Sequence, residues 1–125
     1  MKILVCEDEE ILLTSLEFRL KKQGFDLLLA SDGKQALEHI QNETPDLIVA
    51  DIMMPHVTGL ELISFVREKL KSDIPIIIIS ALGNDEVILK AFELGATDFI
   101  SKPFKPSELV IRIKMIFQEM ALATQ

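Results

Sequence analysis

Five short runs of apolar residues recur along the chain, and the stretches between them mix apolar and polar positions with a helical period. Most of the runs are continuous rather than alternating, which is typical of strands buried on both faces of a parallel sheet. The runs cover residues 2–7, 25–30, 46–51, 74–80 and 97–101. The pattern therefore predicts five buried strands.

The stretches between the runs predict helices, because their apolar residues are spaced by three or four and so share one helical face. Gly24 and Gly95 follow two of these stretches, and Pro106 stands where the last helix would begin, which suits the fixed φ of proline. The spaced residues are Leu12, Leu16 and Leu20; Ala36, Leu37 and Ile40; Leu60, Ile63 and Val66; Val87, Ala91 and Leu94; and Leu109, Ile113, Ile116 and Met120.

Strand and helix alternate five times, which predicts an α/β three-layer sandwich built on a parallel sheet. Right-handed crossovers leave few topologies, and the flavodoxin-like strand order 2-1-3-4-5 with five helices is the common one at this length. The 125 residues fit a single domain, residues 1–125, in which the segment after about residue 120 is a candidate start of a linker.

Composition narrows the class of protein. Thirteen Lys and Arg against twenty Asp and Glu leave a net charge of −7, so we expect no direct contact with nucleic acid. No apolar run approaches the roughly 20 residues of a membrane helix, and the N-terminus lacks a signal-peptide pattern, so we expect no membrane contact. The single Cys6 excludes an internal disulfide, and we expect a cytoplasmic protein in which this thiol is buried and inert.

Acidic residues end two predicted strands that would be neighbours in this sheet. Glu7 and Asp8 end the first run and Asp51 ends the third, at the switch point where such folds bind ligands. Two unit charges ~4 Å apart repel by roughly 4 kcal/mol at an effective dielectric of about 20, so protonation or a cation must relieve the cluster. Oxygen donors without His or Cys favour Mg²⁺.

Two other strand ends add polar groups to the same crevice. Ser80 ends the fourth run and offers a hydroxyl, and Lys102 follows the fifth run and supplies a positive charge. Together with Asp51 as an attacking carboxylate, these groups are the parts that phosphoryl transfer requires.

Four short motifs stand at these strand ends: CEDEE (6–10), DIMMP (51–55), SAL (80–82) and GATDFISKPF (95–104). With them, in this order, the sequence resembles the receiver domain of two-component response regulators, of the chemotaxis-receiver-like kind, from about residue 2 to residue 120. The resemblance implies a phosphoacceptor domain that takes a phosphoryl group from a histidine kinase or a phosphotransfer protein in a Mg²⁺-dependent reaction.

The resemblance also implies a role for each residue of the site. Asp51 would be the phosphoacceptor and would share Mg²⁺ with Glu7, Asp8 and the backbone carbonyl of Met53. Lys102 would pair first with Asp51 and then with the phosphoryl group. Receivers usually have a cis bond before the following proline, so we expect one between Lys102 and Pro103.

A switch is implied as well. Ser80 would turn inward to bind a phosphoryl oxygen, and Ala81 would stay small so that the donor can approach. Phe99 would follow Ser80 inward and change the surface of the fourth helix, fifth strand and fifth helix, although packing against the core is an alternative role for this ring.

The loop after Pro55 departs from the family pattern. Where the family often has Gly-Met-Asp, this chain has His56, Val57 and Thr58, which leaves the loop shape open. His56 either acts in dephosphorylation or is a solvated loop residue without a partner for metal or triad chemistry. Met53 and Leu82 offer no group to orient an attacking water, so we expect a slow loss of phosphate.

The fourth and fifth predicted helices carry more apolar residues than one buried face needs, which indicates a surface for an effector domain or a homodimer. In winged-helix regulators this face carries salt bridges between subunits. Asp98 and Arg112 match part of that pattern, while Thr97 stands where an acid is usual.

Three other functions fit parts of the sequence less well. A degenerate receiver could serve as a protein-interaction scaffold. A Mg²⁺-dependent phosphatase with an aspartyl nucleophile would want a second Asp at the position of Met53, and a flavin site is disfavoured by the acidic loop after the first strand. We expect no enzyme beyond catalysis of the domain's own phosphorylation and dephosphorylation.

Overall fold

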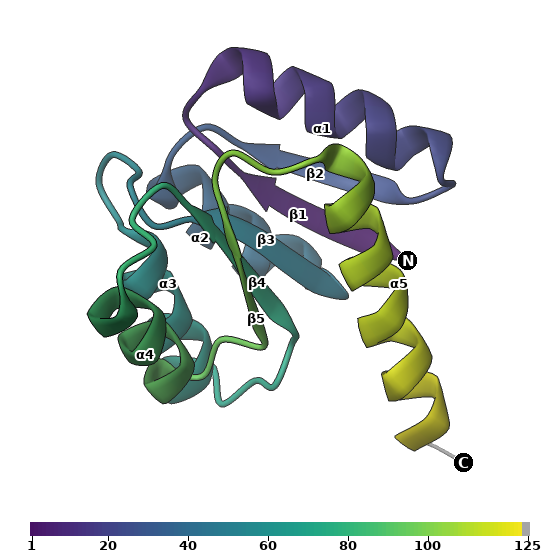
Figure 1. Ribbon diagram of the computed structural model, residues 1–125. Coiled ribbons are helices and arrows are strands. Elements are labelled where there is room, and N and C mark those ends of the chain that lie inside the picture. Colours follow the sequence, from purple (N-terminus) through teal and green to yellow (C-terminus); the bar gives the residue numbers. More distant parts are fainter. Residues whose placement is uncertain (124–125) are drawn as a thin grey trace.

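A computed structural model describes residues 1–123 of the chain and has the predicted flavodoxin-like architecture (Figure 1). A five-stranded parallel sheet has the order β2-β1-β3-β4-β5, which confirms the predicted topology. The strands are β1 (Lys2–Cys6), β2 (Asp26–Ala30), β3 (Leu47–Asp51), β4 (Ile76–Ser80) and β5 (Asp98–Ser101). The helices are α1 (Glu10–Lys22), α2 (Gly33–Glu43), α3 (Gly59–Ser64), α4 (Asp85–Leu94) and α5 (Pro106–Ala123).

Helices cover both faces of the sheet, as the continuous apolar runs predicted (Figure 1). Successive residues of a strand point to opposite faces. In β1, Ile3 and Val5 pack with α1 and α5, whereas Leu4 and Cys6 pack with α2, α3 and α4. The same division runs through β3 and β4, so the domain has two apolar layers on a shared sheet.

The third helix differs from its prediction. The spacing of Leu60, Ile63 and Val66 predicts one regular helix, but α3 ends at Ser64 and the chain continues as a π-helical segment, η1 (Phe65–Lys69). At the other end of the chain, α5 continues past residue 120 to Ala123, and residues 124–125 of the expected linker lie outside the described residues. Within residues 1–123, the helices are too short or too polar to cross a membrane.

The parallel register brings the strand ends to one edge of the sheet. Cys6 at the end of β1 lies beside Ala50 of β3, and Asp51 lies beside Ile79 of β4. The next residues along these strands therefore meet at one edge, and the polar groups predicted from the sequence lie there.

Candidate functional site

The ends of β1 and β3 bring three carboxylates together. One oxygen from each of Glu7, Asp8 and Asp51 lies within 4.8 Å of the others, as the topology predicted. Glu7 is fully buried and Asp51 is 5% exposed, whereas Asp8 is exposed to solvent. The acidic cluster is thus buried at Glu7 and Asp51 and open to solvent at Asp8.

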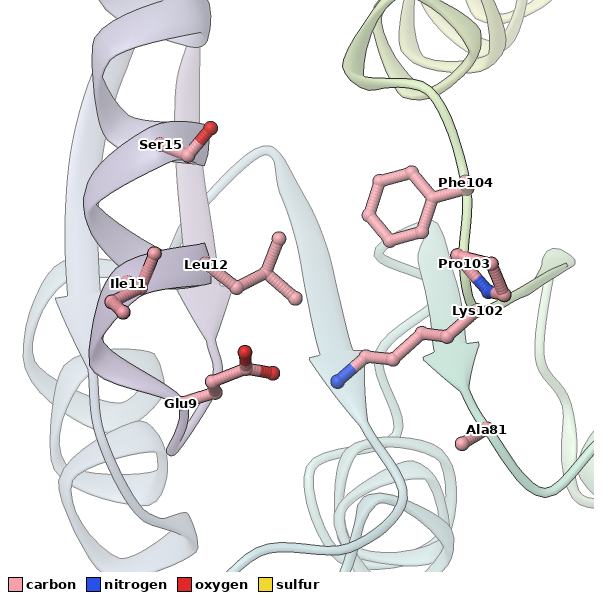
Figure 2. Close-up of a pocket in the computed structure, with 8 residues that line it drawn as sticks. All are labelled: Glu9, Ile11, Leu12, Ser15, Ala81, Lys102, Pro103 and Phe104. Carbon is pink, nitrogen blue, oxygen red and sulfur yellow. The ribbon is translucent and has the colours of Figure 1, made fainter.

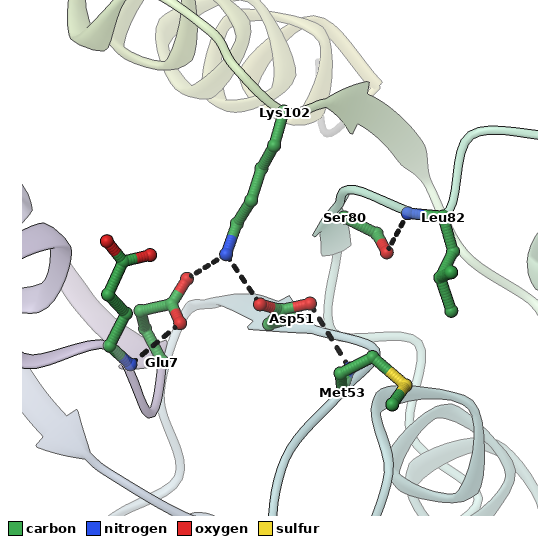
Figure 3. A network of polar contacts seen from close by, with 7 residues as sticks. Glu7, Asp51, Met53, Ser80, Leu82 and Lys102 are labelled. Carbon is green, nitrogen blue, oxygen red and sulfur yellow. Dashed lines mark hydrogen bonds and ion pairs between the residues drawn. The ribbon is translucent and has the colours of Figure 1, made fainter.

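Lys102 joins two of the carboxylates (Figure 3). Its Nζ donates to Glu7 Oε1 and to Asp51 Oδ2, both at 2.6 Å. Burial acts to lower the pKa of Lys102, but the hydrogen bonds to Asp51 and Glu7 and the charges of these two acids together raise this pKa. Burial raises the pKa of the Glu7 carboxyl, the charge of Asp51 adds to the rise, and hydrogen bonds from Lys102 and the Glu9 amide oppose it.

Backbone amides hold the second oxygen of each buried acid. The amide of Met53 donates to Asp51 Oδ1 at 3.2 Å, and the amide of Glu9 donates to Glu7 Oε2 at 3.0 Å (Figure 3). Gly59 closes the loop after β3, because its amide donates to the Ile52 carbonyl at 2.9 Å. A Cβ at Gly59 would lie 2.4 Å from the backbone oxygen of Asp51, so a side chain there would push the acceptor strand out of place.

The donor set fits a magnesium ion. All side-chain donors are carboxylate oxygens, which Mg²⁺ prefers, and Asp8 leaves room for the waters that this ion keeps. Lys102 pairs with Glu7 and Asp51, and within residues 1–123 no ion pair is seen for Asp8, so the three carboxylates retain excess negative charge that a divalent cation would neutralise. Glu7, Asp8 and Asp51 would hold the metal, and the carbonyl of Met53 as a fourth ligand stays a prediction.

The residues of the predicted switch also lie at this edge of the sheet. Ser80 is fully buried, and its Oγ accepts a hydrogen bond from the Leu82 amide at 2.9 Å (Figure 3). Ala81 is exposed beside it. Phe99 is half-buried and packs on the apolar layer under α4, as one of its two predicted roles required, and its switching role stays a prediction. The peptide bond between Lys102 and Pro103 is cis, as expected.

An open pocket of about 450 Å³ lies between the start of α1 and the loop that follows β5 (Figure 2). Lys102 lines this pocket and also belongs to the carboxylate network, so the pocket adjoins the acidic cluster. Its rim includes Ile11, whose side chain is 82% exposed. The sequence did not predict this pocket, because it forms between the start of α1 and the loop after β5, which are far apart in the chain. The lining residues are Glu9, Ile11, Leu12, Ser15, Ala81, Lys102, Pro103 and Phe104.

His56 lies in the loop after β3 and is exposed. Its backbone has a φ of 71°, and the Val57 amide donates to the Pro55 carbonyl at 2.9 Å, which makes a γ-turn with a positive φ at its centre. Pro55 also accepts from the Gly33 amide at 3.1 Å, which fixes the turn against the start of α2. A non-glycine residue thus holds a positive φ at the centre of this turn.

Asp98 and Arg112, the pair matched to an intersubunit pattern, contact one another within this chain. Arg112 Nη1 donates to Asp98 Oδ2 at 2.8 Å and to Oδ1 at 3.0 Å. The hydrogen bond to Asp98 and its charge raise the pKa of Arg112. Exposed apolar side chains near this pair include Leu89 and Phe92 of α4 and Ile111 and Met115 of α5.

A doubly wound sheet that carries an acidic trio and a paired lysine at its carboxyl edge defines the class of receiver domains. The chain belongs to the response regulator receiver domain family, whose model matches residues 3–114.

Several known proteins resemble the chain. It is 39% identical over 122 residues to the alkaline phosphatase synthesis transcriptional regulatory protein PhoP of Bacillus subtilis (strain 168), a match that covers 98% of this chain and 50% of PhoP. It is 40% identical over 119 residues to the probable transcriptional regulator ycf27 of Galdieria sulphuraria, covering 95% of this chain and 46% of ycf27. The chain therefore spans about half the length of these curated relatives. The Francisella response regulator 1452 receiver domain superposes with a TM-score of 0.90 at 34% identity, over 95% of this chain and 98% of that structure.

Proposed function

We propose that this receiver domain accepts a phosphoryl group on Asp51 from a histidine kinase or phosphotransfer protein, in a reaction that requires Mg²⁺. The observation that carries the proposal is the environment of Asp51. The carboxylate is nearly buried, one of its oxygens is 2.6 Å from Lys102 Nζ, and two other acids lie within metal-sharing distance. A buried acid with these neighbours is poised to react with an incoming phosphate rather than only to stabilise the fold.

The reaction would be a direct transfer between two proteins. A carboxylate oxygen of Asp51 attacks the phosphorus of a phosphohistidine, and an O–P bond forms as the donor's N–P bond breaks. The departing imidazole nitrogen keeps the bonding electron pair and takes up a proton. Lys102, already hydrogen-bonded to Asp51, would follow the phosphoryl oxygens and offset their charge.

Mg²⁺, when bound, would supply the positive charge that neutralises the phosphoryl group in the transition state. Glu7 and Asp8 would hold it beside Asp51. The amide of Met53 keeps the second Asp51 oxygen in place, so the attacking oxygen has one orientation. Ser80 would exchange its hydrogen bond from the Leu82 amide for one to a phosphoryl oxygen.

The phosphodonor would approach through the pocket in Figure 2, because this opening adjoins Lys102. The exposed Ile11 at the rim offers apolar surface for a partner protein. We expect Ile11→Lys to leave phosphorylation by acetyl phosphate unchanged and to slow transfer from a phosphorylated partner. Acetyl phosphate reaches Asp51 without covering the rim, so equal losses with both donors would contradict a docking role.

The surface of α4, β5 and α5 would pass the phosphorylation signal to a partner. Phosphorylation would draw Ser80 and Phe99 inward and change this face, which carries the exposed Leu89, Phe92 and Ile111. An effector domain or a second copy would read the change. Sedimentation before and after addition of beryllofluoride tests the second case, and a monomer in both states would leave an effector domain as the reader.

The net charge of −7 supports a role without direct nucleic-acid contact. The role would be carried out in the cytoplasm, where histidine kinases deliver their phosphate. The chemistry would be limited to the domain's own phosphorylation and its slow reversal, without turnover of other substrates. A phosphatase is disfavoured by the apolar Met53, and a scaffold by the completeness of the acidic site.

The experiment that tests the proposal is intact mass measurement after incubation with acetyl phosphate. We expect one added phosphoryl group on the wild type with Mg²⁺ and none on Asp51→Asn or without Mg²⁺. If no adduct forms, titration with beryllofluoride separates rapid hydrolysis from a scaffold, because a functional acceptor still binds the mimic and a scaffold does not.

A further inference from the structure

Arg67 joins three parts of the chain through its guanidinium group. The residue lies in the π-helical segment that follows α3. Its Nε and Nη2 both donate to the Gly95 carbonyl, at 3.0 and 2.9 Å, and its Nη1 donates to the carbonyls of Ser72 and Ile74, at 2.9 and 2.7 Å. All four bonds go to backbone oxygens, so the side chain acts on the course of the main chain.

The Gly95 carbonyl lies at the C-terminal end of α4, where a helix has its partial negative charge. The last turn of α4 has no basic residue of its own, and Arg67 supplies a positive charge there from another element. Gly95 has a φ of 115°, and a Cβ at this position would lie 2.9 Å from the Arg67 side chain. The glycine thus both ends the helix and leaves space for the arginine.

Further bonds fix the chain directly after this helix end. The Thr97 amide donates to the Ile76 carbonyl at 2.8 Å, and Thr97 Oγ1 accepts from the Ile76 amide at 3.0 Å. Ile76 begins β4, a strand buried in the centre of the sheet. The C-terminal end of α4 is therefore attached to the sheet by Thr97 and to the α3 side by Arg67.

The N-terminal end of α4 is held differently. Residues 81–86 are all exposed, and the first turn is capped by a residue of its own loop, Asn84, whose Oδ1 accepts from the Val87 amide at 2.9 Å. This loop is tied to the site by the bond from the Leu82 amide to Ser80 Oγ, at 2.9 Å. A movement of Ser80 would therefore reach the N-terminal end of α4 first.

Packing holds the N-terminal end of α4 less firmly than its C-terminal end. The fully buried side chain of this helix is a small one, Ala91, and Val87 and Leu94 are partly buried against the same apolar layer, whereas Leu89 is exposed. An open groove of about 500 Å³ runs between the C-terminal half of α4 and the α3–η1 segment. The N-terminal end therefore contacts the core mainly through Val87, a smaller attachment than the bonds that hold the C-terminal end.

We infer that Arg67 is a positioning residue that makes the C-terminal end of α4 the pivot about which this helix turns when the acceptor site is occupied. The guanidinium fork fixes Gly95, so displacement of the Ser80–Leu82 link swings the N-terminal end of the helix. The inference rests on the proposed function, since it describes how a phosphoryl group on Asp51 would change the α4 surface.

Amide hydrogen exchange along α4, measured by NMR on the whole chain, tests the pivot. Beryllofluoride with Mg²⁺ serves as the probe, and bound fluoride is followed by ¹⁹F NMR. For the wild type we expect exchange of the Leu82, Val87 and Ile88 amides to change about tenfold or more when the mimic binds. The Gly95 and Ala96 amides, at the pivot, should keep their rates.

The variant Arg67→Met keeps an unbranched side chain but removes the guanidinium group and its hydrogen bonds to the three carbonyls. We expect the Gly95 and Ala96 amides of this variant to exchange about tenfold faster or more without the mimic. We also expect the response to beryllofluoride to spread over both ends of the helix. Arg67→Lys keeps the charge without the fork and should be intermediate, while Arg19→Met, on exposed α1 surface, should behave as the wild type.

The outcomes separate this inference from the proposed function. If the wild type binds beryllofluoride but both ends of α4 respond equally, the pivot is wrong and the acceptor function stands. A uniform acceleration of all amides in Arg67→Met, with an unchanged pattern of response, would give Arg67 a purely structural role and also overturn the pivot. If no fluoride binds to the wild type, the proposed function fails, and the transmitted motion with it.

Discussion

Two apolar side chains lie near the acceptor site in Figure 3, Met53 next to Asp51 and Leu82 next to Ser80. Met53 is 60% exposed and Leu82 is 40% exposed, and both follow a functional residue by two positions. A water that attacks the phosphoryl group needs a polar neighbour to orient it. Neither side chain can provide a strong hydrogen bond, so the phosphorylated state should be long-lived.

The variant Met53→Asn should shorten this lifetime. One net hydrogen bond contributes about 0.5–1.5 kcal/mol, which corresponds to roughly two- to tenfold faster hydrolysis. The decay of the phosphorylated mass after removal of acetyl phosphate measures the rate. Met53→Leu is the matched control and should keep the wild-type rate. An unchanged rate in Met53→Asn would show that this position does not limit the access of water.

His56, in the loop after β3, has a strained backbone. A non-glycine residue at the centre of a γ-turn with a positive φ costs about 1 kcal/mol or more. We expect His56→Gly to raise the free energy of unfolding by about 0.5–1 kcal/mol, since part of the gain is lost to the greater freedom of glycine in the unfolded chain. Urea denaturation measures the change. His56→Val should be less stable than the wild type, and a destabilised His56→Gly would mean that the imidazole makes a contact that outweighs the strain.

At the scale of elements, β1 lies inside the sheet between β2 and β3, with both faces covered. Cys6 in this strand is fully buried, and burial raises the pKa of its thiol. The folded protein therefore keeps the thiol protonated at pH values where the unfolded chain ionises it, above about 8.5. The contribution of the thiol to stability is complete below that pH and falls as the pH rises.

The slope of this loss should approach about 1.4 kcal/mol per pH unit above pH 9. Cys6→Ala should lack it, so the difference in unfolding free energy between the two proteins should shrink between pH 8 and pH 10. Urea denaturation at each pH measures the difference and cancels the groups that both proteins share. A constant difference across this range would mean that the folded protein ionises Cys6 as easily as the unfolded chain does.

The elements also show what a sequence can and cannot predict. Strand β4 could be predicted because four isoleucines in a row, residues 76–79, form a short, β-branched apolar run, which favours a strand buried on both faces. The acidic trio followed from topology alone, since parallel strands end at the same edge. The Lys102 contacts to Glu7 and Asp51 were foreseen in part, through the family resemblance.

Other features could not be predicted from the sequence. The Arg67 bonds all go to backbone carbonyls, and a carbonyl is the same at every position, so no residue type marks the acceptors. The π-helical turn after Ser64 has no pattern of its own, because it depends on how the chain returns to β4. The Ser80–Leu82 bond depends on a side-chain rotamer rather than on a residue type.

At the scale of the whole molecule, the acidic trio connects stability to metal binding. The chain has a net charge of −7, and three of its carboxylates are held within 4.8 Å of one another by the fold. The unfolded chain does not hold them together, so a cation that binds the trio binds the folded state. Mg²⁺ should therefore raise the free energy of unfolding, by about 2.7 kcal/mol at a hundredfold excess over its dissociation constant.

The variant Asp8→Asn should separate this effect from general charge screening. Removal of one of three like charges should stabilise the metal-free protein by up to about 1 kcal/mol, because Asp8 is exposed and its repulsion is screened. The same change should remove most of the gain from Mg²⁺. Asp26→Asn, at the opposite edge of the sheet, should keep the full gain in stability from Mg²⁺. NaCl at equal ionic strength should raise the stability of the wild type and both variants only slightly. Thermal unfolding of the wild type and both variants in EDTA, in Mg²⁺ and in NaCl measures these differences. An equal gain for Asp8→Asn and the wild type would mean that the metal stabilises the fold elsewhere, and the acidic trio would then lose its assignment as the magnesium site.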